Sequence, residues 1–205
     1  MNVIKNIKKL KQDLITLTKK DTQLKVFGAE SHRYRLNPTL SKSYILQFEE
    51  THEIHLPDDY RIFLKEVANG GAGPNYGMYR LEDYYQSRFR SGSDAGYVGK
   101  DFLKTPFPYT KSNQLKPLDP SDEDDADDGL SDEEYGKKFI KKFSGAITLS
   151  HQGCGYYDML IVSGEERGTV WMDATVSDQG IRYVFNSFAD WYFDWLKSSI
   201  LTCSK

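Results

Sequence analysis

Hydrophobic residues recur at helical spacing in four parts of the chain. Near the N-terminus, Ile7, Leu10, Leu14 and Leu17 fall on one stripe while lysines occupy the other faces. This pattern predicts an amphipathic helix over residues 1–20. Three further segments place apolar residues three or four positions apart, as a helix that buries one face does. These segments are residues 41–51, 57–69 and 188–200.

Start and stop signals flank two of these segments. Pro57 suits the first position of a helix, and Gly70 allows the left-handed exit that ends one. Ser187 and Asp190 resemble a capping box at the start of the last segment. These signals place the helix ends where the hydrophobic pattern also places them.

Between residues 146 and 185 the pattern changes from helix to strand. Short β-branched and aromatic runs alternate with glycine-containing turns, which predicts strands joined as antiparallel hairpins. A further short strand is predicted at 78–81, and residues 83–145 are the least regular part of the pattern. We therefore expect an α+β fold, a largely antiparallel sheet packed with N-terminal and C-terminal helices. The main strands are predicted at 146–150, 158–164, 168–173 and 181–185.

Length and composition are those of one domain. The chain has 205 residues, of which 39% are hydrophobic and 14% aromatic, enough for a core without disulfide staples. Only two cysteines occur, and no apolar run suits a signal peptide or a membrane span. We therefore expect a single domain over residues 1–205, in the cytoplasm and without membrane insertion.

An acidic stretch stands apart from the rest of the charge pattern. Residues 119–134 hold ten carboxylates and no lysine or arginine, so the other residues sum to +7 in a chain of net charge −3. We interpret residues around 110–136 as an acidic insertion, which is either a solvated loop or a contact surface for a basic partner. Ala126 and Tyr135 stand where an EF-hand needs ligands, so at most a weak, improvised calcium site remains.

His151 and Cys154 are the candidates for catalytic or metal chemistry. A nucleophile and base need an orienting third group, and a structural zinc site needs four ligands. Cys154 lies between Gly153 and Gly155, which suits a small buried thiol instead. No phosphate-binding loop, dinucleotide fingerprint or nucleic-acid-binding pattern occurs. We therefore expect no enzyme, no cofactor, no metal and no direct contact with nucleic acid.

Three stretches resemble the SMI1/KNR4 superfamily, the SUKH fold, in the expected order. LPDDYRIFLKEVANGGAGPNYGMYRL resembles its central motif, in which a Leu-Pro pair opens a helix that leaves through Gly-Gly. ITLSHQGCGYYDMLIVSGEERGTVWMDATVSDQGI is similar to the second half, and FADWYFDWLKSSI to the terminal helix. The resemblance implies an α+β scaffold that is non-enzymatic in its known members. Its scaffold would rest on Leu56, Pro57, Tyr60, Phe63, Gly70, Gly153, Gly155 and Trp171.

The resemblance also implies a function. Bacterial members are typically immunity proteins that bind and neutralise a toxin domain, often a nuclease, whereas fungal members regulate cell-wall synthesis. The chain lacks long disordered flanks and so resembles the bacterial branch, with a regulatory or scaffolding module as the alternative. The partner expected is a cognate toxin domain with a basic surface, which clustered carboxylates would attract. The contact residues expected are Asp122, Glu123, Asp124, Asp125, Asp127, Asp128, Tyr156 and Tyr157.

Overall fold

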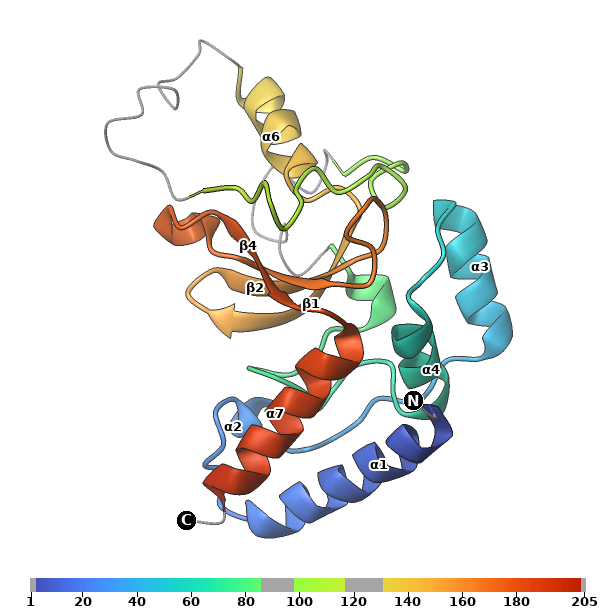
Figure 1. Ribbon diagram of the computed structural model, residues 1–205, viewed down its shortest axis with the longest axis vertical. Coiled ribbons are helices and arrows are strands. Elements are labelled where there is room, and N and C mark those ends of the chain that lie inside the picture. Colours follow the sequence, from blue (N-terminus) through green and yellow to red (C-terminus); the bar gives the residue numbers. More distant parts are fainter. Residues whose placement is uncertain (1–2, 86–97, 117–130, 204–205) are drawn as a thin grey trace.

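The computed structural model (Figure 1) describes residues 3–85, 98–116 and 131–203 and confirms the expected α+β fold. Helices come first, a sheet follows, and a helix closes the chain. The helices are α1 (Val3–Lys20), α2 (Ala29–His32), α3 (Lys42–His52), α4 (Asp58–Glu66), α6 (Asp132–Lys141) and α7 (Phe188–Thr202). The strands are β1 (Ala146–Gly153), β2 (Tyr156–Ile161), β3 (Val170–Asp173) and β4 (Ile181–Phe185).

The four strands form an antiparallel sheet in the order β1-β2-β3-β4, so each strand pairs with the next one along the chain. Single bridges continue the sheet at both edges. Met78 pairs with Ser150 beside β1, and Leu115 pairs with Ile181 of β4. The hairpins that the sequence predicts between residues 146 and 185 are therefore confirmed.

The short strand predicted at 78–81 is wrong. Met78 makes isolated bridges only, and a 3-10 turn begins at Leu81. Gly77, the residue directly before Met78, has φ of +100°, which takes the backbone out of the extended conformation at that point. The segment therefore lies along the edge of β1 without becoming a strand.

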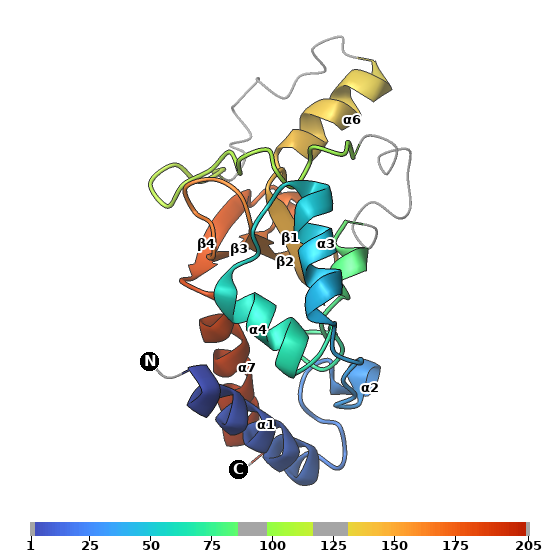
Figure 2. The same ribbon diagram turned by 90° about the vertical axis from the view of Figure 1, so that its right-hand side faces the viewer.

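The sheet separates two layers, which Figures 1 and 2 show from two directions. α7, α4 and α1 lie on one side, and α6 lies on the other together with residues 98–116. On the first side, the ring of Phe63 in α4 packs against that of Phe188 in α7, with the ring centroids 5.0 Å apart. On the second, the buried ring of Trp171 in β3 packs 5.1 Å from that of Phe107. Phe63 and Trp171 are therefore core residues, as the resemblance implies.

The N-terminal helix is confirmed, and it packs along α7. Its predicted stripe is the buried face, because Leu10, Leu14 and Leu17 are all enclosed. Lys8, Lys9 and Lys11 remain at the surface, as an amphipathic helix requires. None of the described helices is both long and apolar enough to cross a lipid bilayer.

α6 (Asp132–Lys141) lies in the part of the sequence with the least regular pattern, where no helix is predicted. Its start is a reciprocal capping box, in which Ser131 accepts from the Glu134 N–H and the Glu134 side chain accepts from the Ser131 N–H. Glu133 and Glu134, which end the acidic stretch, thus lie in the first turn of a helix, where the helix dipole favours negative charge. The rest of that stretch, residues 119–130, lies outside the described residues.

Candidate functional site

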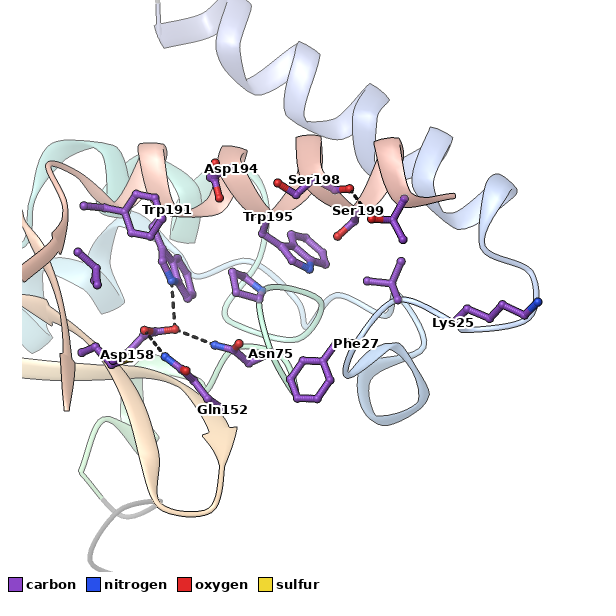
Figure 3. A pocket seen from close by; sticks show the side chains of 16 residues that line it. Lys25, Phe27, Asn75, Gln152, Asp158, Trp191, Asp194, Trp195, Ser198 and Ser199 are labelled. Atoms are coloured by element: carbon purple, nitrogen blue, oxygen red, sulfur yellow. Dashed lines mark hydrogen bonds between the residues drawn. The ribbon is translucent and has the colours of Figure 1, made fainter. Parts of the chain in front are cut away.

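A cleft of about 480 Å³ opens between α7, the β1–β2 hairpin and the loop before α2 (Figure 3). Its inner end is polar and holds Asn75, Gln152 and Asp158. Trp191 stands beside this polar end and Trp195 lies further out, and the two rings project from neighbouring turns of α7. A concave pocket of this size, which combines aromatic side chains with polar groups gathered around one carboxylate, has the form of a binding site.

Asp158 is the most enclosed charge in this cleft, with 5% of its surface exposed. Its Oδ2 accepts hydrogen bonds from Asn75 Nδ2 at 2.7 Å, Ser150 Oγ at 3.1 Å and Trp191 Nε1 at 3.2 Å. Its Oδ1 accepts one, from Gln152 Nε2 at 2.8 Å. All four donors are neutral. Burial raises the pKa of the carboxyl group, although these hydrogen bonds oppose the rise.

Strand pairing explains how these donors come together. Asp158 lies opposite Ser150 across the β1–β2 pair, and Gln152 follows Ser150 by two residues, so it points to the same face. Asn75 has φ of +58° in a turn that is held to β1 by a hydrogen bond from the Tyr76 N–H to a strand carbonyl. Trp191 reaches the carboxylate from the first turns of α7. Three segments distant in the chain therefore meet at one carboxylate.

A buried histidine packs against Trp195, which lines the outer part of the cleft. The rings of His32 and Trp195 meet edge to face, with centroids 5.9 Å apart. His32 Nδ1 accepts the Tyr34 N–H at 3.0 Å, and burial lowers its pKa from 6.5 to about 4, against the influence of Asp21. The imidazole is therefore neutral at pH 7, with its proton on Nε2. Among the described residues, neither His32 Nε2 nor Trp195 Nε1 has a hydrogen-bond partner.

An aromatic row borders the cleft, formed by Phe27, Tyr76, His151 and Tyr157. Neighbouring ring centroids in this order are 5.2, 6.0 and 4.8 Å apart. Phe27 also lines the cleft, so the row begins at the cleft's outer rim. Phe27 is 59% exposed and Tyr76 44%, which is high for side chains of this size. The row and the cleft therefore present one continuous surface.

The sequence-predicted contact residues fall into three groups. Tyr157 belongs to the aromatic row, whereas Tyr156 donates its hydroxyl hydrogen bond to Ser177 Oγ at 2.7 Å and has no ring contact with the row. The six carboxylates of residues 122–128 lie outside the described residues. Sequence reasoning missed Phe27, Tyr76 and Asp158. For Asp158 the available signal is a lone carboxylate at the start of the apolar run DMLIV, since buried carboxylates in strands need arranged partners.

His151 and Cys154 do not form the catalytic pair that their spacing allows. His151 Nε2 accepts the N–H of Gly155 at 3.4 Å, so the imidazole supports the hairpin turn. The interpretation of Cys154 as a buried thiol is wrong, because the residue is exposed at the hairpin tip with φ of +51°. Over residues 3–85, 98–116 and 131–203, no group of three or more potential ligands is arranged to hold a metal ion.

Comparison with known proteins gives one result that bears on identity. The chain matches the model of the SMI1/KNR4 family (SUKH-1) over residues 39–194. No match is found among curated proteins. The family match covers well over half of the chain and contains the entire sheet together with the first turns of α7. The chain therefore belongs to the SMI1/KNR4 family.

Proposed function

We propose that this protein is an immunity protein, which binds a cognate bacterial toxin domain in the cytoplasm and blocks it without catalysing a reaction. Membership of the SMI1/KNR4 family supports a binding role, because the bacterial proteins that the chain resembles act in this way. The observation that carries the proposal is the aromatic row beside a cleft with a carboxylate at its inner end.

Exposed rings next to a pocket are typical of the centre of a protein interface. Tyrosine and tryptophan give large contact areas at a small entropic cost and dominate the binding energy of many complexes. Tyr76 is held between the rings of Phe27 and His151, and it lies close over Gly153, where a Cβ would come within 3.2 Å of the Tyr76 ring. Such a fixed ring loses little conformational freedom when a partner covers it.

Electrostatic attraction is the second part of the proposed mechanism. The carboxylates Asp122, Glu123, Asp124, Asp125, Asp127 and Asp128 would draw in a partner with a basic surface and raise the association rate. A nuclease toxin has such a surface because its substrate is a polyanion. The aromatic row would then hold the docked toxin, and the bulk of the domain would obstruct its active site.

Growth of a host that expresses the toxin domain encoded beside this protein tests the proposal. Wild-type protein should restore growth. Tyr76→Ala should lose affinity by about 2 kcal/mol, roughly thirtyfold, and restore growth poorly. Tyr44→Ala is the matched control, because Tyr44 is 40% exposed but lies on α3, away from the row.

A variant with residues 122–128 neutralised separates steering from docking. It should associate more slowly than wild type, with a weaker dependence on salt. Failure of the folded wild-type protein to protect against an active toxin would reject this pairing. Several unrelated partners in a pull-down, without toxicity of any of them, would then favour the regulatory or scaffolding module.

A further inference from the structure

We propose that the cleft receives an arginine side chain of the partner protein, whose guanidinium group pairs with the Asp158 carboxylate. This inference rests on the proposed function, because the arginine is supplied by the toxin domain. It places the centre of the interface at the cleft and gives the acidic stretch a role in approach only.

Asp158 carries a charge that the protein itself leaves without a cation. Its four hydrogen bonds all come from neutral groups, and in the described part of the chain no lysine or arginine pairs with it. Glu49 shows the alternative, since this equally buried carboxylate forms an ion pair with Arg61 at 3.1 Å. Buried charges are normally paired in this second manner.

In the described part of the chain, one oxygen of this carboxylate accepts fewer hydrogen bonds than it can. Each carboxylate oxygen accepts about two hydrogen bonds, and Asp158 Oδ2 already accepts three while Oδ1 accepts one. A guanidinium group that donates to Oδ1 would therefore add a charge-assisted hydrogen bond without displacing the existing donors. Asp158 would keep its position, because Asn75, Gln152 and Trp191 fix it from three directions (Figure 3).

The walls of the cleft favour arginine over lysine. Trp191, Trp195, Phe27 and Phe185 all line it, and a planar guanidinium group stacks on aromatic faces, whereas a compact ammonium does so less well. Lys25 is the one basic residue among the described residues that line the cleft, and in Figure 3 it extends away from Asp158. The protein's own lysine therefore does not occupy the place that we assign to the partner's arginine.

The size and origin of the outer rim fit a protein partner. A volume of about 480 Å³ leaves room for more than one side chain, so the loop that carries the arginine would enter as well. Phe27, Trp195 and Ser198 line the outer part of the cleft and lie outside residues 39–194, which the family model matches. The rim is thus built from segments beyond the family match, and we expect these segments to determine which partner the cleft binds.

Titration with a blocked arginine tests the inference without any toxin. Nα-acetyl-arginine amide should change the tryptophan fluorescence, because Trp191 and Trp195 line the cleft while Trp171 is fully buried. We expect saturation in the millimolar range. Nα-acetyl-citrulline amide has the same shape without the charge and should bind at least about tenfold more weakly.

Variants then locate the binding site. Asp158→Asn should abolish the response, whereas Glu165→Gln, an exposed carboxylate that does not line the cleft, should leave it unchanged. Because Asn cannot accept from four donors, circular dichroism and thermal unfolding must show that the Asp158→Asn protein is folded. If it is not, Phe27→Ala provides the test, since this side chain is mostly exposed and its removal leaves the core intact.

The outcomes separate this inference from the proposed function. Equal responses to the arginine and citrulline compounds, or no response up to about 50 mM, would overturn the arginine site. Protection against the toxin by a folded Asp158→Asn or Phe27→Ala protein, equal to that of wild type, would also overturn it and leave the immunity function standing. A response to arginine without protection by the wild type would support the site and reject the toxin pairing.

Discussion

Acidification should destabilise this protein through His32. The imidazole is 8% exposed, accepts the Tyr34 N–H on Nδ1 and packs against Trp195 in the cleft wall. Burial lowers its pKa to about 4, while an unfolded chain has the ordinary value of 6.5. The unfolded state therefore takes up a proton first, and the folded state loses stability as the pH falls from about 6.5 to about 4.

The magnitude follows from the difference between the two pKa values. One pKa unit corresponds to about 1.36 kcal/mol, so His32 should cost the folded state about 2 kcal/mol at pH 5 relative to pH 8. The cost approaches about 3 kcal/mol at pH 4. For a domain of this length, the loss at pH 5 corresponds to a melting temperature lower by roughly 4–8 °C.

Urea unfolding at pH 8 and pH 5 measures this effect, with His32→Asn as the reference. The amide oxygen of Asn can accept the Tyr34 N–H in place of Nδ1 and does not titrate. Asp59 and Asp158 have pKa values raised by burial and act in the opposite direction, but they contribute equally in both proteins. The free energy of unfolding should therefore fall more steeply with acid in the wild type. An equal fall in both proteins would refute a buried neutral His32.

Three further predictions concern the scaffold and the thiols. Leu17→Ala should cost about 2–5 kcal/mol in urea unfolding because Leu17 is fully buried between α1 and the core, whereas Ile15→Ala, exposed on the same helix, should cost less than about 0.5 kcal/mol. Gly180→Ala should lower the free energy of unfolding by about 3 kcal/mol or more, since the new Cβ would lie 1.9 Å from a backbone oxygen. Gly168 also has a positive φ but has open space around it, so Gly168→Ala should lower the free energy of unfolding by only about 1–2 kcal/mol. Equal losses in urea unfolding would contradict the steric argument. Mass spectrometry after brief treatment with iodoacetamide should find Cys154 alkylated ahead of Cys203, because burial raises the pKa of the Cys203 thiol. The reverse order would contradict the exposure of the hairpin tip.

Much of the fold follows from local pattern. Ser187 caps α7 as the sequence predicts, α3 lies within the predicted segment 41–51 to within one residue, and the four strands lie within a few residues of the predicted runs. α6 was missed because its first turn belongs to the acidic stretch, where charge dominates the pattern. The capping box of Ser131 and Glu134 was nevertheless a readable local signal for that helix.

The candidate site could be predicted only in part, because it depends on long-range contacts. Tyr157 is recognisable as an aromatic residue at a hairpin end, but Phe27 and Tyr76 join it only through the bridge between the 71–78 segment and β1. The exposure of Cys154 was missed for a different reason. Flanking glycines suit a small buried thiol, but they equally permit a tight turn in which the residue between them is exposed, and the hairpin tip adopts this second arrangement.

The N-terminal segment holds the outer rim of the cleft through one buried carboxylate. Asp21 accepts the Tyr34 hydroxyl at 2.6 Å and the N–H groups of Lys25 and Val26 at 2.7 and 3.0 Å. Burial opposes ionisation of Asp21, but these hydrogen bonds hold its pKa below the ordinary value. The backbone of residues 25–26 is thereby fixed, and Phe27 follows directly at the rim.

Asp21, Tyr34 and His32 form one cluster, which also contacts Trp195 on the other side of the rim. The Tyr34 N–H donates to His32 Nδ1, and the His32 ring packs against Trp195. Both aromatic sides of the rim therefore depend on one buried polar cluster, which lies outside the residues that the family model matches. A rim held in this way is already ordered before a partner arrives, so binding would not have to supply the free energy of ordering it. The segments beyond the family match thus do more than cover the core, because they give the cleft a fixed shape.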